Sequence, residues 1–272
     1  LVLIFTVLLL FACDFDSSKV ERIQVSGPVI LEKMSFGDFS EIVIAGPIDV
    51  TLDQNQGSSL EVETYESLMP FFRAEIYEDA LILYVIDTSS TMHFNLDTGF
   101  EEFTRDAFLS SSRLKWPDNK KVLKVHLSFG DLEKIQIIGE CDMETLQTLK
   151  AEKLKLEVAG ACHFDADLDV KVFDAEIAGA GNLDLRGSAE RFSLDCAGAG
   201  TVKAYNFIAD SVDLEIAGVC NAHVYAVESI DVEVAGMGTI KYMGNPSNIS
   251  FEKAGIGSLK KVESEESEET EI

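Results

Sequence analysis

The chain has 272 residues, of which 48 are acidic and 22 basic, so its formal net charge is −26 at pH 7. This acidity disfavours nucleic acid and anionic lipid surfaces as partners, because their phosphates would be repelled. The length suits one large domain or two small ones.

The first twelve residues are almost wholly apolar. They are too few to span a bilayer, which needs about 20, but they suit the hydrophobic region of a secretory signal peptide whose start is truncated. The segment ends Leu10-Phe11-Ala12-Cys13 and then turns polar. This order resembles a bacterial lipobox, in which the cysteine is lipidated. The alternative is an ordinary signal peptide with an incidental cysteine. We therefore predict a signal peptide over 1–12, lipidation at Cys13 and a linker over 13–21, which makes the protein an extracytoplasmic lipoprotein of the outer membrane whose lipid anchor contacts the membrane.

Two phrases near the N-terminus, at 22–31 and 41–50, place Gly27 and Gly46 19 residues apart and predict two early turns of a repeat. Another such phrase, at 132–139, ends on a glycine. The regular pattern is lost between the second and third phrases.

The intervening segment contains less regular patterns. Residues 58–86 predict two strands joined by a loop around Met69-Pro70, and residues 121–128 alternate like a strand. Residues 87–121 are rich in Ser, Asp and Asn and predict an excursion. We expect an irregular N-terminal cap, because the terminal turns of a solenoid must shield an open core end.

The C-terminal half repeats a short phrase built around Ala-Gly. The glycines of successive phrases, called corner glycines below, are spaced by 19, 19, 20, 18 and 19 residues: Gly160, Gly179, Gly198, Gly218, Gly236 and Gly255. Positions are counted from the corner glycine. Apolar residues fill −6, −4, −2 and +4, and polar residues fill −5 and −3, as in strands with one face inward.

This pattern predicts an all-β fold, a right-handed parallel β-helix with about 19–20 residues per turn. The Ala-Gly pair marks a corner, where a missing side chain lets the backbone bend or take a positive φ. We expect one β-helix domain over 22–262 and an acidic, disordered tail over 263–272.

Acidic residues recur at −3 and form a candidate weak cation ladder: Glu157, Glu176, Asp195, Glu215 and Glu233. Stacked about 4.8 Å apart, they would repel each other, and Ca²⁺ would relieve that repulsion. Carboxylates on a flat face diverge, however, so a solvated face is the favoured interpretation. We predict no metal site and no cofactor.

Small polar residues recur at +3, among them Asn182, Thr201 and Asn221. We expect them to satisfy backbone groups at the corner, with binding on the same edge as the alternative. Basic residues on the regular turns are few and scattered, and His163 and His223 occupy different positions, which indicates surface residues without a shared role.

Four further cysteines follow the repeat and not a disulfide framework. Three of them lie at +2, where other turns have glycine, so small buried thiols are expected. Cys141 and Cys162 lie at this position in consecutive turns, and a bridge between them stays open.

The combination of the phrases GPIDVTL (46–52), the Ala-Gly turns, IKYMGNP (240–246) and AGIGSLKKV (254–262) resembles the auto-transporter adhesin head GIN domain family of secreted proteins and lipoproteins of Bacteroidota. The resemblance covers about residues 38–262. It implies a right-handed parallel β-helix, an envelope location and a role in adhesion. It carries no catalytic residues with it.

The leading functional hypothesis is a non-catalytic lipoprotein that binds a glycan or a cell-surface or matrix protein. Aromatic residues of the 87–121 excursion are the predicted surface-binding residues: Phe94, Phe100, Phe103, Phe108 and Trp116. The alternatives are a polysaccharide-active β-helix enzyme of the pectate lyase or polygalacturonase type, with the excursion as a cleft wall, and a structural envelope protein without an external ligand. The oligomeric state stays open.

Overall fold

The structure is a computed structural model that describes residues 21–22, 25–55, 57–86, 114–115 and 122–263. The chain divides into two compact units. The first unit comprises residues up to 146 together with 159–162, and the second comprises 147–158 and the residues from 163 onward.

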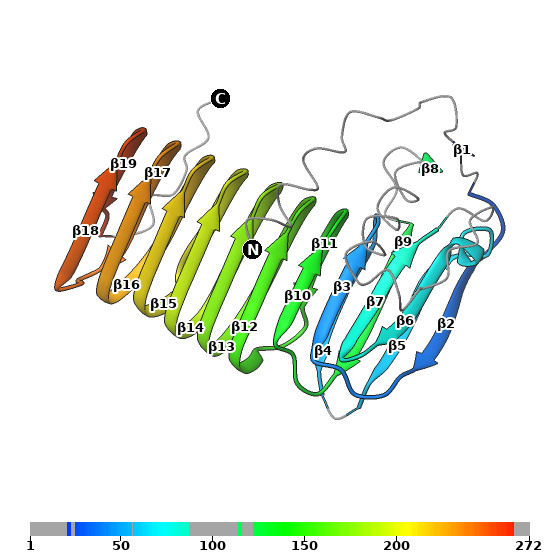
Figure 1. The fold of residues 1–272 in the computed structure, drawn as a ribbon. Coiled ribbons are helices and arrows are strands. Elements are labelled where there is room, and N and C mark those ends of the chain that lie inside the picture. Colours follow the sequence, from blue (N-terminus) through cyan, green and yellow to red (C-terminus); the bar gives the residue numbers. More distant parts are fainter. Residues whose placement is uncertain (1–20, 23–24, 56, 87–113, 116–121, 264–272) are drawn as a thin grey trace. The chain divides into compact units, whose positions relative to one another are not determined.

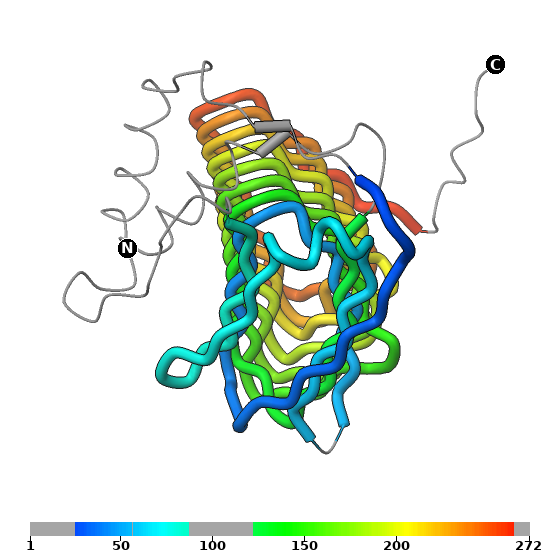
Figure 2. The backbone as a smooth tube through the Cα atoms, turned by 90° about the vertical axis from the view of Figure 1, so that its right-hand side faces the viewer, coloured from blue at the N-terminus to red at the C-terminus, as the bar shows by residue number. Residues whose placement is uncertain are grey.

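The second unit is a stack of parallel turns, each called a rung below (Figure 1). Its strands are β12 (Leu149–Val158), β13 (Ala161–Ile177, from His163 onward), β14 (Ala180–Cys196), β15 (Ala199–Ile216), β16 (Val219–Val234), β17 (Met237–Gly244), β18 (Asn248–Lys253) and β19 (Ile256–Lys261). Residues at equal positions pair in register from rung to rung. Figure 2 shows these rungs one behind another. The predicted parallel β-helix is confirmed.

Alternation of side chains places the apolar residues inside each rung. In β15, for example, Val212, Leu214 and Ile216 are buried, whereas Glu215 is exposed. Three phenylalanines also pack inside this unit: the Phe173 and Phe192 rings stack with centroids 5.7 Å apart, and Phe207 meets Phe192 edge-on at 5.7 Å. Burial of such rings supplies about 1.5–3 kcal/mol each.

The corners are held by hydrogen bonds between rungs. The amides of Ala217 and Gly218 both donate to the carbonyl of Cys196, and the amide of Val219 donates to the carbonyl of Gly198. A Cβ on Gly218 would lie 1.9 Å from the carbonyl oxygen of Gly198. The corner glycines of the second unit do not take a positive φ. Of the two explanations offered by the sequence, close backbone approach is therefore the one that applies here.

The first unit contains rungs that are distant in sequence. Its strands are β1 (Glu21–Arg22), β2 (Val29–Ser35), β3 (Glu41–Ala45), β4 (Asp49–Gln54), β5 (Ser59–Tyr65), β6 (Phe72–Tyr77), β7 (Ala80–Val85), β8 (Leu114–Lys115), β9 (Leu123–Phe129), β10 (Lys134–Ile137) and β11 (Glu140–Thr145), with a 3₁₀ turn at Met69–Phe71. Strand β3 pairs in parallel with β7 and β10, and β4 pairs in parallel with β9 and β11. The predicted phrases at 41–50 and 132–139 are thus adjacent rungs.

Antiparallel strands complete the first unit and correct two expectations. The segment 22–31 was expected to form a rung, but β2 runs antiparallel to β5, which in turn is antiparallel to β9. Residues 58–86 form three strands and not two, because β6 and β7 make a hairpin. The predicted irregular cap is present as this antiparallel part.

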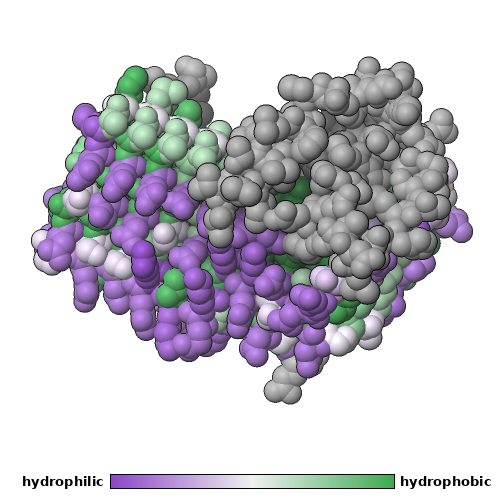
Figure 3. All heavy atoms as spheres, viewed as in Figure 1, coloured by the Kyte–Doolittle hydropathy of each residue, from purple (hydrophilic) through white to green (hydrophobic). Residues whose placement is uncertain are grey.

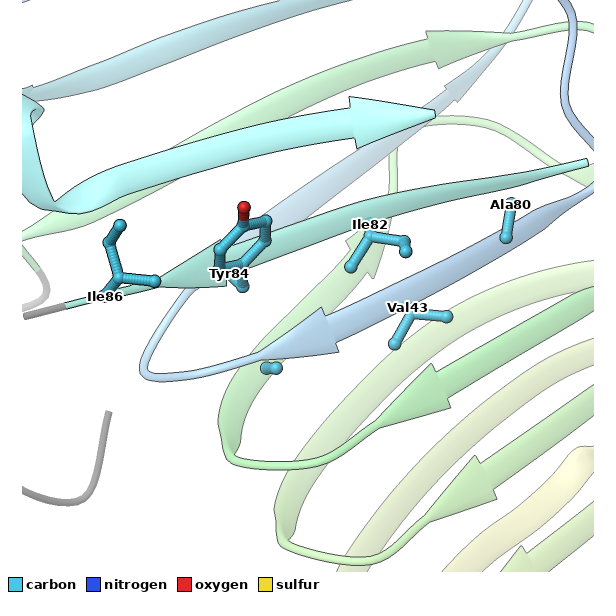
Figure 4. Packing of buried hydrophobic residues seen from close by; sticks show 6 residues of the cluster. Val43, Ala80, Ile82, Tyr84 and Ile86 are labelled. Atoms are coloured by element: carbon cyan, nitrogen blue, oxygen red, sulfur yellow. The ribbon is translucent and has the colours of Figure 1, made fainter. Parts of the chain in front are cut away.

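A cluster of buried residues fills one side of this unit (Figure 4). Val43, Ala80, Ile82, Tyr84 and Ile86 lie together, and the Tyr84 hydroxyl donates to Glu75 over 2.9 Å. Burial raises the pKa of Tyr84 far above its ordinary value. The cluster contributes an apolar core to the antiparallel part. Within the described ranges, no helix is long and apolar enough to cross a bilayer.

Candidate functional site

Outward side chains at equal positions form columns along the second unit, because its rungs pair in register. The predicted acidic ladder at −3 is such a column: Glu157 pairs with Glu176, Asp195 with Glu215, and Glu215 and Glu252 both flank Glu233. The sequence therefore predicted the alignment of these carboxylates correctly.

Lysine neutralises one end of the acidic column. The Lys155 ammonium lies 2.7 Å from Glu157 Oε1 and 2.8 Å from Glu176 Oε1. The next two carboxylates lie beyond it. Burial and the charge of Glu176 raise the pKa of Asp195, and the charge of Asp195 raises the pKa of Glu215. The column thus carries a real electrostatic cost in its middle.

The carboxylates of this column do not converge on a point. Within the described part of the chain, no three His, Cys, Asp or Glu side chains are placed to hold a metal ion. The column is a row of parallel acids on a flat face, and its geometry offers an approaching cation one or two carboxylates at a time.

The polar residues at +3 form a second column. Asn182, Thr201, Asn221, Thr239 and Ser258 stand in register on the outer face. Four of them are exposed and Thr201 is half-buried. None of these five side chains makes a hydrogen bond to another described residue. They do not satisfy corner backbone groups, contrary to our expectation, so their hydroxyl and amide groups face outward.

The residues at +5 form a third column whose charge changes sign along the stack. Asp184 pairs with Lys203, and then His223, Lys241 and Lys260 follow on successive rungs. The His223 ring stacks on Tyr205 with centroids 5.0 Å apart. The basic residues at this position are therefore aligned and not scattered, which corrects the expectation from the sequence. Counting the same position from each corner glycine would have found this column.

A row of apolar side chains runs along the corners at +1. Its exposure is high in the last three rungs, at 45% for Val219, 50% for Met237 and 75% for Ile256, and alanine takes this position in the rungs before them. Figure 3 shows green and pale-green residues in a row over the second unit, beside purple rows of polar residues. The acidic and basic columns therefore lie on opposite sides of an apolar corner.

Two shallow grooves lie on the described surface. One, of about 650 Å³, is lined on the second unit by charged residues that include Lys150, Glu152, Asp169 and Lys171. Two ion pairs use these charges, between Lys150 and Asp169 at 3.6 Å and between Lys171 and Glu152.

The other groove, of about 760 Å³, belongs to the first unit and is lined by Ile30, Met34, Met69 and Phe72 among others. Arg73 lies at its edge and donates to the carbonyls of Pro70 and Phe72.

The predicted lipidation and surface-binding residues lie outside the described residues. This applies to Cys13 and to all five aromatic residues: Phe94, Phe100, Phe103, Phe108 and Trp116. Those predictions stay predictions.

The cysteines at 141, 162, 196 and 220 are buried free thiols. Burial raises the pKa of Cys141 well above its ordinary value and that of Cys162 to about 12. The sequence offered Cys141 and Cys162 as the pair able to meet, but Cys196 and Cys220 also interact, and a hydrogen bond from one thiol to the other raises the pKa of Cys220. This contact arises because −2 of one rung and +2 of the next both face inward beside Gly200, whose Cβ would lie 3.1 and 3.4 Å from the two sulfurs.

The fold and these columns define a parallel β-solenoid that presents flat, chemically distinct rows on its outer face. Over residues 38–246 the chain matches the family described as "Putative auto-transporter adhesin, head GIN domain", and it belongs to that family. It is an adhesin-type protein by family. No curated protein matches it.

Solved structures share this fold. A "putative adhesin" from Bacteroides fragilis is 23% identical, with a TM-score of 0.74, and the match covers 89% of this chain and 100% of that one. A "Putative lipid binding protein" from Parabacteroides distasonis is 21% identical, with a TM-score of 0.68 and the same coverages. A "putative adhesin" from Parabacteroides merdae is 18% identical, with a TM-score of 0.61 over the same shares.

Proposed function

We propose that this protein is a non-catalytic, surface-displayed binding protein, held outside the cytoplasm by a lipid on Cys13, that contacts a glycan or a cell-surface or matrix protein. The observation that carries this proposal is the stacking of outward residues into columns, of which the −3 column is acidic and the +3 column is formed by small polar residues. Such columns suit a long ligand or surface contacted at many equivalent points, because each rung adds one similar contact. The adhesin description of the family supports the same conclusion.

The anchor rests on the apolar segment 1–12 and on the residues around Cys13. It predicts that the protein, expressed behind a complete signal sequence in a Bacteroidota host, incorporates labelled fatty acid and fractionates with the outer membrane. Replacement Cys13→Ser would remove the label and release the protein, because a thioether-linked lipid needs the thiol. A matched Cys196→Ser variant should keep the label. Labelled Cys13→Ser protein would contradict the anchor.

The main alternative is a polysaccharide-active β-helix enzyme. Hydrolysis or elimination needs carboxylates or a base that converge on one bond. In the groove of the second unit, Lys150 and Lys171 are ion-paired with Asp169 and Glu152 at a charged, shallow surface. This arrangement favours binding over turnover.

One experiment separates binding from catalysis. The full chain, solubilised in a non-ionic detergent, is applied to a glycan array with and without Ca²⁺, and is incubated with polygalacturonate while reducing ends and unsaturated products are measured. We expect reproducible binding without product. Released oligosaccharide would overturn the non-catalytic proposal, and a fully silent array would overturn glycan binding and leave a protein ligand to be sought.

A further inference from the structure

The basic column at +5 is the least expected feature of this acidic protein. Lys203, His223, Lys241 and Lys260 occupy one outward position on four successive rungs. Neighbouring strands lie about 4.8 Å apart, so these side chains repel one another when charged. A protein with a formal charge of −26 could place acidic residues there, as it does at Asp165 and Asp184 on the two preceding rungs. A local cost of this kind is expected where a ligand compensates for it.

The neighbours of the basic column suit a sugar chain. On one side stands the +3 column, whose outward hydroxyl and amide groups at Thr201, Asn221, Thr239 and Ser258 form no hydrogen bonds with other described residues. On the other side, at +7, Tyr225 pairs with Met243, whereas Tyr205 lies in a register shift and stacks on His223 with ring centroids 5.0 Å apart. Rows of hydrogen-bonding groups and cations, with tyrosine rings beside them, are contacts that an anionic pyranose chain needs.

The acids of the −3 column lie on the strand before each corner, and the +5 cations lie on the strand after it. Exposed charges further apart than the Debye length, about 8 Å at physiological ionic strength, are largely screened from each other. The nearest acid in the column itself is Asp184, 3.6 Å from the Lys203 ammonium, and Arg186 is paired with Asp165. The three rungs that follow carry His223, Lys241 and Lys260.

We propose that the face formed by the +3 and +5 columns from Lys203 to Lys260, with the Tyr205 and Tyr225 rings beside them, binds a linear anionic glycan, with carboxylate or sulfate groups on a pyranose chain that lies along the stack. This inference rests on the proposed binding function and names its ligand class. The advance of a pyranose unit in an extended chain is comparable to the spacing of rungs, so successive acidic sugars meet successive cations. Each contact lies at the surface and is weak, and affinity comes from the number of contacts.

The test uses the full chain in detergent and two matched polymers, polygalacturonate and its fully methyl-esterified form, immobilised for biolayer interferometry. The triple variant Lys203→Gln, Lys241→Gln, Lys260→Gln removes three charges from the face. The control variant Lys33→Gln, Lys124→Gln, Lys153→Gln removes the same number from strands β2, β9 and β12, away from this face and from both grooves. Circular dichroism checks both folds, and replacing the first three lysines with arginine keeps the charge should the glutamine variant not fold.

We expect the wild type and the control variant to bind polygalacturonate within about twofold of each other, and the triple variant to bind about tenfold or more weakly. None of these proteins should bind the methyl-esterified polymer, and the arginine variant should still bind polygalacturonate. The inference is overturned if polygalacturonate does not bind, or if both glutamine variants lose affinity for it equally. It is also overturned if the triple substitution abolishes binding to phosphatidylglycerol vesicles but leaves the affinity for polygalacturonate unchanged. Binding of neutral sugars alone on the array would refute the anionic ligand but retain the proposed function.

Discussion

The corner glycines are needed because a Cβ atom at these positions would not fit between neighbouring rungs. Each rung passes so close to the previous one that a methyl group on Gly218 would overlap the carbonyl oxygen of Gly198, at 1.9 Å. That carbonyl also accepts the amide of Val219, so it cannot simply move aside. The glycine is therefore needed for close packing and for a hydrogen bond at once.

This geometry predicts that Gly218→Ala lowers the free energy of unfolding by about 3 kcal/mol or more, because two backbones must separate. Urea denaturation followed by circular dichroism measures the loss. The control is Gly130→Ala, where a Cβ would meet no atom within 4 Å and the change should stay within about 0.5 kcal/mol. An unchanged urea midpoint for Gly218→Ala would show that the corner tolerates a side chain.

At the scale of single residues, the sequence predicted which carboxylates align. It predicted neither the contact between Cys196 and Cys220 nor the alignment of the basic residues at +5. The −3 acids are found by counting from one glycine to the next. The contact between Cys196 and Cys220 joins −2 of one rung to +2 of the next, so it needs the turn of the corner in three dimensions. The basic column was detectable by the same counting and was missed because its members differ in residue type.

At the scale of elements, the rungs were predictable and the antiparallel cap was not. Rungs follow from alternation and a fixed period, which are local. The segment around Gly27 carries a similar phrase, yet β2 pairs antiparallel with β5, because a short phrase does not specify its partner strand. The β6–β7 hairpin turns at Glu78, with a φ of 51°, and lacks the Asn-Gly or Asp-Gly signal that marks tight hairpins.

The independence of rungs gives a prediction about deletion. Removal of residues 180–198 joins Gly179 to Ala199 and takes out one whole turn. Each rung contacts only its neighbours, so the shortened chain should fold with reduced stability and keep a strand-rich circular dichroism spectrum.

A deletion of residues 180–188 is the matched control. It removes half a turn, so the rungs on the two sides of the deletion no longer stack in register, and it should give an insoluble or unfolded protein. If both deletions behaved alike in solubility and in the cooperativity of urea unfolding, the rung would not be the unit of folding.

At the scale of the whole molecule, charge is separated by column. The acids at −3 and the cations at +5 lie on opposite sides of the apolar corner row, and further acids follow Val262 in the sequence. A net charge of −26 favours solubility, while each column has a local charge of its own. Composition alone disfavours nucleic acid and anionic lipid surfaces as partners, and the register of the rungs shows where cations nevertheless gather on one face.

Buried thiols make the stability of the protein sensitive to alkaline pH. The pKa of Cys162 is raised to about 12 by burial, and that of Cys141 is raised in the same way. In the unfolded chain a thiol ionises near pH 8.5. Because the folded pKa lies above the unfolded value, this contribution to stability is fully present below about pH 8.5 and is lost as the pH rises toward the folded pKa. Between pH 8 and pH 10 the Cys162 thiol should cost about 2 kcal/mol of unfolding free energy. Urea unfolding in the presence of a reductant measures this dependence of stability on pH. The Cys162→Ala variant is expected to be less stable than the wild type at pH 8. Between pH 8 and pH 10 its free energy of unfolding should fall by about 2 kcal/mol less than that of the wild type. Parallel slopes for the two proteins would mean that the Cys162 thiol ionises in the folded chain as readily as in the unfolded one.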